Sequence, residues 1–433
     1  MKNKQAAYYI TAAELSELGF EKLPSELKSK DHLIYSSPAA LSFNSPGAQG
    51  FGVKRAGLAV PGSVMLLVAP ACCGRNTTML AELGSYADRF YYLLQDDTDI
   101  ITGRHLNRIS KAVAEVADFH EESTGTRPSC VMICITCVDA LLGTDMERVC
   151  RKASEHAGLP VLPCYMYALE REGRVPPMTA VRKTVYSLLE PRAKKSTTVN
   201  LLGHFAPLRD DSEIYELLRS IGIKKINEIS RCADFDEYLG MAEANFNIIL
   251  NPESRHAAED IASRLQIPSI EITRMYRLDK IRRQYELFAG ALGVEMDDSA
   301  FYSEAEKRVK EFSSRHAGKR AAIGECMNAD SFELALALTE YGLKVTEIYG
   351  TVSQERMAYI KRLAAVSPDT RIYTNLEPSM LYYDSGELEC DLTIGIDAGY
   401  YHPDAPNVPW NLEIQPWGYR GLIGLIDDME GVL

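Results

Sequence analysis

Short apolar runs alternate with longer amphipathic stretches from about residue 60 to the end of the chain. The short runs are rich in β-branched residues, which is typical of buried strands, whereas the longer stretches place apolar residues three and four positions apart, as helices do. The predicted strands are residues 64–68, 130–135, 161–165, 198–202, 247–250, 269–272, 320–323, 344–348, 371–373 and 392–396. The predicted helices are residues 101–119, 145–157, 213–221, 257–265 and 332–341.

This alternation predicts parallel sheets that are covered on both faces by helices. Several predicted helices end at a glycine just before a new strand, for example at Gly222 and Gly342. Glycine in this position permits the left-handed backbone conformation that closes a helix. The predicted fold class is therefore α/β, with three Rossmann-like lobes built on parallel sheets.

Two polar, basic breaks near residues 190–196 and 313–319 divide the chain. A chain of 433 residues is also long enough for two or three domains. The predicted organisation is an N-terminal extension arranged around the first lobe, then three α/β lobes, the third of which contains a C-terminal closing segment. The corresponding ranges are residues 1–40, 41–193, 194–315 and 316–433.

The composition is that of a soluble globular protein, with 46% hydrophobic and 25% charged residues, and the lack of a secretory signal predicts that the protein stays in the cytoplasm. Its net charge of −13 argues against a nucleic acid partner, because an acidic surface repels phosphates. The sequence contains no run of about 20 apolar residues and no apolar signal segment, so we expect no membrane association. Neither a Gly-x-Gly-x-x-Gly turn nor a Walker-type loop follows a predicted strand, so we do not expect ATP to bind.

Two adjacent cysteines, Cys72 and Cys73, follow the first predicted strand and precede a helix that is predicted to begin near Thr77. Ligands of α/β proteins bind at the carboxyl ends of strands, which is where these thiols are expected. Arg75 and the nearby helix dipole would favour the thiolate. The alternative is that two small apolar residues cap the strand.

A third cysteine, Cys137, lies where the strand predicted at residues 130–135 gives way to a helix. Cys130 and Cys134 fall within that strand and are expected in the core. The spacing of Cys134 and Cys137 also occurs in zinc and thioredoxin-type sites. However, no second pair and no histidine follows at zinc spacing, and Cys134 does not stand at a helix start. Thr144 or Asp145 is expected to cap the next helix.

Several motifs, taken in order, resemble those of the nitrogenase component 1 family. The family's Gly-Pro-x-Gly-Cys turn is similar to residues 69–73, and its Cys-x4-Ile-Gly-Asp-Asp segment is similar to residues 137–145. The resemblance implies that Cys73 and Cys137 hold an iron–sulfur cluster. The further segments that resemble the family are residues 96–103, 200–205, 217–223, 265–268 and 415–425.

Ligand counting suggests how such a cluster would be held. A four-iron cluster usually has four protein ligands, so Cys73 and Cys137 from two subunits would complete one cluster at a two-fold interface. The predicted partner is thus a second copy of the chain or a paralogous subunit. Cys72 is left open as a further ligand, a redox thiol or a packing residue.

The chain also departs from the family pattern. The third cysteine of family members with the larger eight-iron cluster is missing from residues 43–50. No cysteine occurs in residues 248–252 and no histidine near residues 407–410, where nitrogenase binds its catalytic cofactor; His402 lies too far upstream to match. We therefore expect neither a molybdenum cofactor nor dinitrogen reduction.

The resemblance implies a nitrogenase-like oxidoreductase, namely the catalytic-type component of a two-component reductase. An ATP-dependent iron–sulfur reductase would supply its low-potential electrons, and the substrate would be a small molecule or a tetrapyrrole. The alternatives are a scaffold for metal-cluster or cofactor assembly and a cluster-free binding protein with three lobes. His204, Arg255 and His256 are candidates for a substrate cleft, with helix capping or a solvated helix end as the alternative for each. No catalytic residue is assigned.

Overall fold

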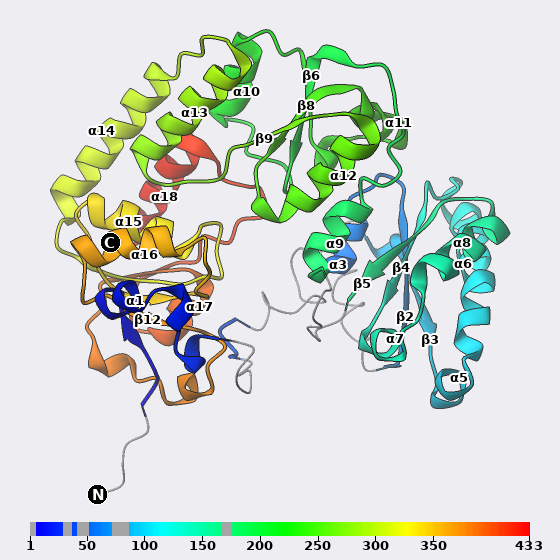
Figure 1. Cartoon of the computed structure of the whole chain (residues 1–433), viewed down its shortest axis with the longest axis horizontal. Coiled ribbons are helices and arrows are strands. Elements are labelled where there is room, and N and C mark those ends of the chain that lie inside the picture. Colours follow the sequence, from blue (N-terminus) through cyan, green and yellow to red (C-terminus); the bar gives the residue numbers. More distant parts are fainter. Residues whose placement is uncertain (1–5, 29–36, 41–51, 72–85, 167–174) are drawn as a thin grey trace, which may run out of the picture. The chain divides into compact units, whose positions relative to one another are not determined.

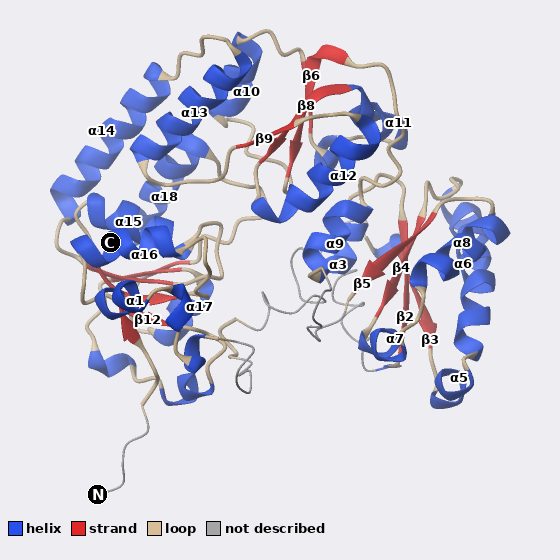
Figure 2. Cartoon of the chain, viewed as in Figure 1, coloured by secondary structure: helices blue, strands red, loops and turns tan. Residues whose placement is uncertain are grey.

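A computed structural model describes residues 6–28, 37–40, 52–71, 86–166 and 175–433. The chain divides into two compact units. Residues 43–207 and 222–273 belong to the first, here called the two-sheet unit, and residues 1–42, 208–221 and 274–433 to the second, the one-sheet unit. The described residues form three sheets, drawn as separate groups of red strands in Figure 2. The predicted α/β class with three parallel-sheet lobes is confirmed, whereas the exact lobe boundaries stay a prediction.

The first-lobe sheet is four-stranded and parallel, in the order β3-β2-β4-β5. Every residue of β2 and β4 is buried, as expected for central strands that helices cover on both faces. Its strands are β2 (Val64–Ala69), β3 (Phe90–Leu94), β4 (Val131–Ile135) and β5 (Val161–Tyr165).

Helices cover both faces of the first-lobe sheet (Figure 1). Successive side chains of a strand point to opposite faces, so Leu66 of β2 packs with α6 and α8 while Leu67 packs with α3 and α9. Two short helices, α5 and α7, follow the carboxyl ends of β3 and β4. The helices are α3 (Val53–Gly57), α5 (Asp97–Thr102), α6 (Arg104–Thr124), α7 (Cys137–Leu142), α8 (Met146–Ala157) and α9 (Pro177–Thr184).

The second-lobe sheet is also parallel, in the order β7-β6-β8-β9. Buried asparagines cross it on neighbouring strands: Asn200 Nδ2 donates to Asn247 Oδ1, and Asn227 Nδ2 donates to Asn200 Oδ1, each at 2.9 Å. These bonds satisfy buried amides and fix the register of the strands. The elements are β6 (Lys195–Leu202), β7 (Lys225–Asn227), β8 (Ala244–Ile249), β9 (Ser269–Glu271), α11 (Phe235–Leu239) and α12 (Arg255–Leu265).

The one-sheet unit contains the third-lobe sheet, in the order β1-β12-β11-β10-β13-β14. Its strands are parallel except β1. The strands are β1 (Ile10–Thr11), β10 (Arg320–Ile323), β11 (Lys344–Tyr349), β12 (Arg371–Tyr373), β13 (Leu392–Ile394) and β14 (Asn407–Val408). The helices are α1 (Ala12–Leu18), α10 (Glu213–Ser220), α13 (Leu278–Leu292), α14 (Ser299–His316), α15 (Ser331–Glu340), α16 (Met357–Val366), α17 (Ile396–Tyr401) and α18 (Gly418–Val432).

The N-terminal segment corrects one prediction, since we expected it around the first lobe. Ile10 and Thr11 instead pair with Ile372 and Arg371 of β12, and Tyr8 N donates to Ser379 Oγ at 2.8 Å. β1 therefore closes the edge of the third-lobe sheet. The prediction failed because a two-residue strand has no periodicity that would identify its partner.

The predicted closing segment, residues 415–425, begins α18 around a buried carboxylate. Glu213 Oε1 accepts hydrogen bonds from Tyr419 N at 2.7 Å and from Tyr285 OH at 2.8 Å. Gly418 has φ +56°, and a Cβ there would lie 1.7 Å from Glu213 Oε1. The close approach of the carboxylate to the start of α18 therefore requires glycine at this position.

The glycines predicted to close helices have the expected conformation, with φ of +91° at Gly222 and +94° at Gly342. Gln266, which ends α12, also has a positive φ of 56°. In the part of the chain that the structure describes, none of the helices combines the length and the apolar character required to cross a membrane.

Candidate functional site

Cys137 stands at the carboxyl end of the first-lobe sheet, as predicted. β4 ends at Ile135, Thr136 precedes α7, and Cys137 is the first residue of that helix. Cys137 is half-buried. The predicted ligands Cys72 and Cys73 come after β2, the strand next to β4, but lie outside the described residues.

A buried network surrounds Asp139, two residues after Cys137. The carboxylate accepts hydrogen bonds from Thr144 Oγ1 at 3.0 Å and Gln95 Nε2 at 3.3 Å, and its Oδ1 lies 3.1 Å from His105 Nε2. Both Asp139 and His105 are buried. Because Asp139 belongs to α7, these contacts hold the turn that carries Cys137 against α6 and the end of β3.

The second nitrogen of His105 is also engaged. Its Nδ1 lies 3.2 Å from the backbone oxygen of Asp99, so each ring nitrogen faces an acceptor. The Asp99 side chain forms ion pairs with Arg104, at 3.4 Å, and with Arg108. Asp96 caps α5 by accepting from Asp99 N at 2.7 Å. The predicted motif at residues 96–103 thus forms the helix that anchors His105.

The other cysteines of the first lobe that the structure describes belong to its core. Cys130 and Cys134 are fully buried, as predicted, and so is Cys164, the register partner of Cys134 on β5. Burial raises the pKa of Cys130 and of Cys150 to about 12, so both remain protonated thiols at neutral pH. Within the described ranges, no three His, Cys, Asp or Glu side chains gather as a metal-binding group.

Helix α8 is capped as predicted, but the two capping candidates have separate roles. Asp145 Oδ1 accepts from Arg148 N at 3.0 Å and is the cap. Thr144 instead donates its hydroxyl to Asp139. The loop between α7 and α8 therefore contributes both to helix α8 and to the network beside Cys137.

The three cleft candidates lie at the carboxyl edge of the second-lobe sheet. His204 follows β6, while Arg255 and His256 begin α12 after β8, the neighbour of β6. Arg255 forms a two-bond ion pair with Glu271 of β9, with both N–O distances at 2.7 Å. His204 and His256 are half-buried. Their role in binding a substrate remains a prediction.

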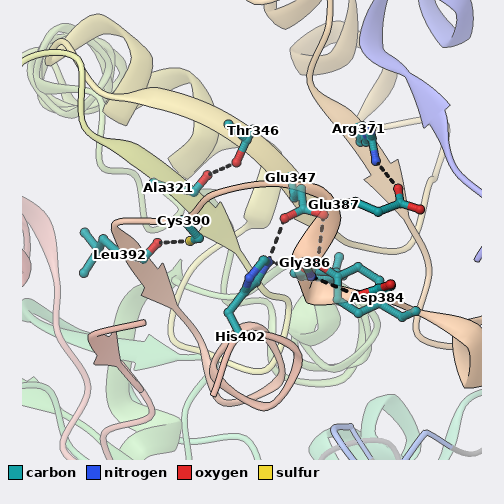
Figure 3. Close-up of polar contacts among 12 residues, drawn as sticks. Ala321, Thr346, Glu347, Arg371, Asp384, Gly386, Glu387, Cys390, Leu392 and His402 are labelled. Carbon is teal, nitrogen blue, oxygen red and sulfur yellow. Dashed lines mark hydrogen bonds and ion pairs between the residues drawn. The ribbon is translucent and has the colours of Figure 1, made fainter. Parts of the chain in front are cut away.

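His402, the histidine near the C-terminus, is enclosed in the third lobe. Figure 3 shows its ring directed at Glu347 of β11, and the Nε2–Oε2 distance is 2.7 Å. Tyr383 donates its hydroxyl to Glu347 Oε1 at 2.9 Å, and Tyr349 donates to the Tyr383 hydroxyl at 2.7 Å. The pair is buried and surrounded by tyrosines, so His402 is engaged inside the protein.

Asp397, another polar residue near a strand end of the third lobe, is fully buried. Its carboxylate accepts from Glu325 N at 2.9 Å, Cys326 N at 3.1 Å and Asn375 Nδ2 at 2.8 Å. Burial raises the pKa of Asp397 and of Glu325. The hydrogen bonds tie together the loops that follow β10, β12 and β13.

The family described as nitrogenase component 1 type oxidoreductase matches residues 48–433. The chain belongs to this family. The resemblance expected from the order of the motifs is therefore confirmed.

Relatives in the nitrogenase component 1 family include cofactor biosynthesis proteins. The nitrogenase iron-molybdenum cofactor biosynthesis protein NifE of Sinorhizobium fredii is 24% identical over 360 residues, which cover 77% of this chain and 70% of that protein. NifE of Rhizobium meliloti is 24% identical over 358 residues, covering 77% and 72%. The similarity thus extends over most of both proteins.

Solved nitrogenases share the fold of this family member. A structure described as "Nitrogenase Cp1 at pH 6.5" aligns with a TM-score of 0.68 over 93% of each chain, at 13% sequence identity. A second, "Nitrogenase Cp1 at pH 5", has a TM-score of 0.62, 14% identity and coverage of 92% of this chain and 88% of the other. Identities this low establish the architecture only.

Family membership supports the oxidoreductase class in general terms. The names of the relatives, by contrast, favour the predicted alternative, an assembly scaffold, over a substrate-reducing component.

Proposed function

We propose that this chain holds an iron–sulfur cluster as cargo during the assembly of a metal cofactor. The observation that carries the proposal is the half-buried Cys137 at the carboxyl edge of the first-lobe sheet, supported by the buried network of Asp139. Ligands of α/β proteins bind at this edge. The relatives named as cofactor biosynthesis proteins support the assembly role over the reductase role.

The donor set fits a cluster rather than a hard cation. Thiolates are the usual ligands of iron–sulfur clusters, whereas carboxylates and carbonyls suit magnesium or calcium. Asp139, the carboxylate nearest to Cys137 in sequence, is already occupied by His105, Gln95 and Thr144. Cys137 would therefore bind the cargo while Asp139 orients the helix that presents it.

The remaining ligands are proposed from the sequence. Cys73 is the second thiol, and Cys72 beside it is the candidate for a third. Two thiols per chain leave a four-iron cluster short of its usual four ligands. A second copy of the chain or a paralogous subunit would supply the others, and an ATP-dependent iron–sulfur reductase would be a further, transient partner.

The first test is the iron and acid-labile sulfide content of protein purified without oxygen, with its oligomeric mass. About two irons and two sulfides per chain in a dimer would match one four-iron cluster held between subunits. Protein that is folded but takes up no iron, even after incubation with ferrous iron and sulfide, would reject the proposal.

Variants identify the ligands. We expect Cys73→Ala and Cys137→Ala to abolish cluster binding, because each removes a thiolate ligand. Cys326→Ala is the matched control, since Cys326 is a buried thiol of the one-sheet unit and its loss should leave the iron content unchanged. Full iron retention in both first-lobe variants would show that the ligand assignment is wrong.

A transfer experiment separates the assembly role from the reductase role. The loaded protein is mixed with a cluster-free acceptor of the same family, and iron is measured on both proteins after separation. Movement of iron to the acceptor supports the assembly role. Repeated reduction of a substrate with an ATP-dependent reductase, while the iron stays on this chain, would support the reductase role instead.

A further inference from the structure

Two buried polar atoms near Cys137 have no hydrogen-bond partner among the residues that the structure describes. They are the hydroxyl oxygen of Thr136 and the amide oxygen Oε1 of Gln95. The two residues are only 2% and 3% exposed. An unsatisfied buried polar atom destabilises a fold, and a bound water or ligand is one established explanation for such an atom in a native protein.

Both atoms belong to the same edge of the first-lobe sheet. Thr136 directly precedes Cys137 at the end of β4, and its hydroxyl makes no capping bond to α7. Gln95 directly follows β3, and its backbone N–H donates to Ala69 O at the end of β2 at 3.0 Å. Since β3, β2 and β4 are neighbours in that order, the two residues flank the exit of β2.

The orientation of the Gln95 amide follows from its other contact. A carboxylate accepts hydrogen bonds, so the Gln95 atom that faces Asp139 must be the NH₂ group, as the 3.3 Å contact has it. The oxygen Oε1 is therefore the atom left without a donor. Asp139 itself is satisfied by three partners. Among the described residues of this network, the atoms without a hydrogen-bond partner are therefore Gln95 Oε1 and Thr136 Oγ1.

We infer that Thr136 is a further binding residue of this site, a step that rests on the proposed function. Its hydroxyl donates a hydrogen bond to sulfur of the bound cargo, either a sulfide or the iron-bound Cys137 thiolate. Gln95 Oε1 accepts from a group that the occupant brings, such as a water molecule. The ligand class is therefore an iron–sulfur cluster, whose sulfur accepts from Thr136, accompanied by a water molecule that donates to Gln95 Oε1.

Hydrogen bonds to sulfur stabilise the more negative, reduced state of a cluster and so raise its reduction potential. Thr136 would then affect two measurable properties, the potential of the cluster and the rate at which it is lost. A residue that only supports the fold would alter neither the potential nor the spectrum of a cluster that is still bound.

The test uses the full chain after anaerobic incubation with ferrous iron and sulfide. Thr136→Val removes the hydroxyl while keeping the shape, Thr136→Ser keeps the hydroxyl, and Thr136→Ala is the smaller substitute if valine does not fold. The matched control is Thr393→Val, because Thr393 is fully buried in the one-sheet unit and its hydroxyl donates to Asn407 Oδ1 at 2.9 Å.

For Thr136→Val we expect loss of iron to a chelator to be about three- to tenfold faster, as for one lost hydrogen bond. The midpoint potential should shift to more negative values, and Thr136→Ser should restore both properties. The iron-free valine variant should unfold at the same or a higher urea concentration than the wild type. Thr393→Val should leave loss rate and potential unchanged.

Each alternative result has a definite meaning. If the wild type takes up no iron and sulfide, the proposed function fails and this inference fails with it. If the wild type binds iron but Thr136→Val and Thr136→Ala match it in loss rate and potential, the assignment of Thr136 alone is overturned.

Discussion

Two buried histidine–carboxylate pairs occur in the described part of the chain, one in each unit. His105 and Asp139 are 3.1 Å apart in the two-sheet unit, and His402 and Glu347 are 2.7 Å apart in the one-sheet unit. In both pairs an imidazole Nε2 atom faces a carboxylate oxygen. The two pairs differ in the groups that surround them. Comparing them therefore shows what the surrounding groups contribute.

The His402–Glu347 pair has a complete set of partners. Tyr383 and Tyr349 extend the hydrogen bonds, and the rings of Tyr349 and Tyr401 stack 4.6 Å apart on the same core. The His105–Asp139 pair is also satisfied, but it lies beside a half-buried thiol and two polar atoms that have no partner among the described residues. A saturated polar network fixes a fold, whereas the same network next to unmet hydrogen-bonding groups supports a binding site.

The largest expected effect comes from removing each carboxylate in turn. Glu347→Ala should lower the free energy of unfolding of the one-sheet unit by about 3–5 kcal/mol, because it removes a buried carboxylate that accepts from Tyr383 and lies 2.7 Å from His402, and hydrogen bonds to a charged group contribute about 1.5–3 kcal/mol each. Both tryptophans of the chain, Trp410 and Trp417, belong to this unit, so tryptophan fluorescence in urea reports on it selectively.

Asp139→Ala is the matched variant in the other unit. It should leave the urea midpoint measured by tryptophan fluorescence unchanged. It should lower the amount of iron that the protein retains. If both variants shift the tryptophan transition equally, the two pairs do not act independently and the comparison fails.

The stability of the one-sheet unit should also depend on pH. Burial raises the pKa of Glu333, on α15, to about 7. A carboxyl group whose folded-state pKa lies above the unfolded value of about 4.3 binds its proton more tightly in the folded state. The stability that Glu333 contributes is therefore greatest at low pH and falls as the pH rises from about 4.5 to about 7, by roughly 3 kcal/mol in total.

Urea unfolding followed by tryptophan fluorescence between pH 5 and pH 8 measures this slope. In the Glu333→Gln variant, whose residue 333 cannot ionise, the free energy of unfolding should change less with pH. A slope that is unchanged in the glutamine variant would assign the pH dependence to another group.

The smallest effect is expected for an exposed charged pair. Arg255 and Glu271 have side chains that are 45% and 29% exposed, and ion pairs of this kind contribute about 0–1 kcal/mol. Arg255→Ala should therefore change the free energy of unfolding by less than about 1 kcal/mol, as followed by circular dichroism in urea, and should leave the iron content unchanged. Loss of cargo transfer in this variant would instead favour a role in the cleft.

The sequence was sufficient for the strands with continuous apolar runs, such as β2 and β4, because buried central strands produce this pattern. It did not predict β3, an edge strand whose tyrosines alternate between half-buried and exposed positions. β7 has only three residues, too few to establish a period. Length alone does not explain the missed strands, because β12, which also has three residues, was predicted.

The candidate site was predicted in part. The strand exit at Cys137 is a local feature, and local features can be seen in a sequence. The partners of Asp139 cannot, because His105 and Gln95 lie 34 and 44 residues before it and no spacing rule connects them. Arg255 is a similar case, since its ion pair with Glu271 depends on the order of β8 and β9 in the sheet.

The pairing of β1 with β12 has a consequence for synthesis on the ribosome. Tyr8 and Ser379, which are hydrogen-bonded in the folded unit, are 371 residues apart. At about 5–20 residues per second, β1 emerges on the order of tens of seconds before its partner. During this interval its backbone groups have no strand to pair with. The residues of the two-sheet unit, with Cys137, have all been made by then, so that unit has the time to fold first.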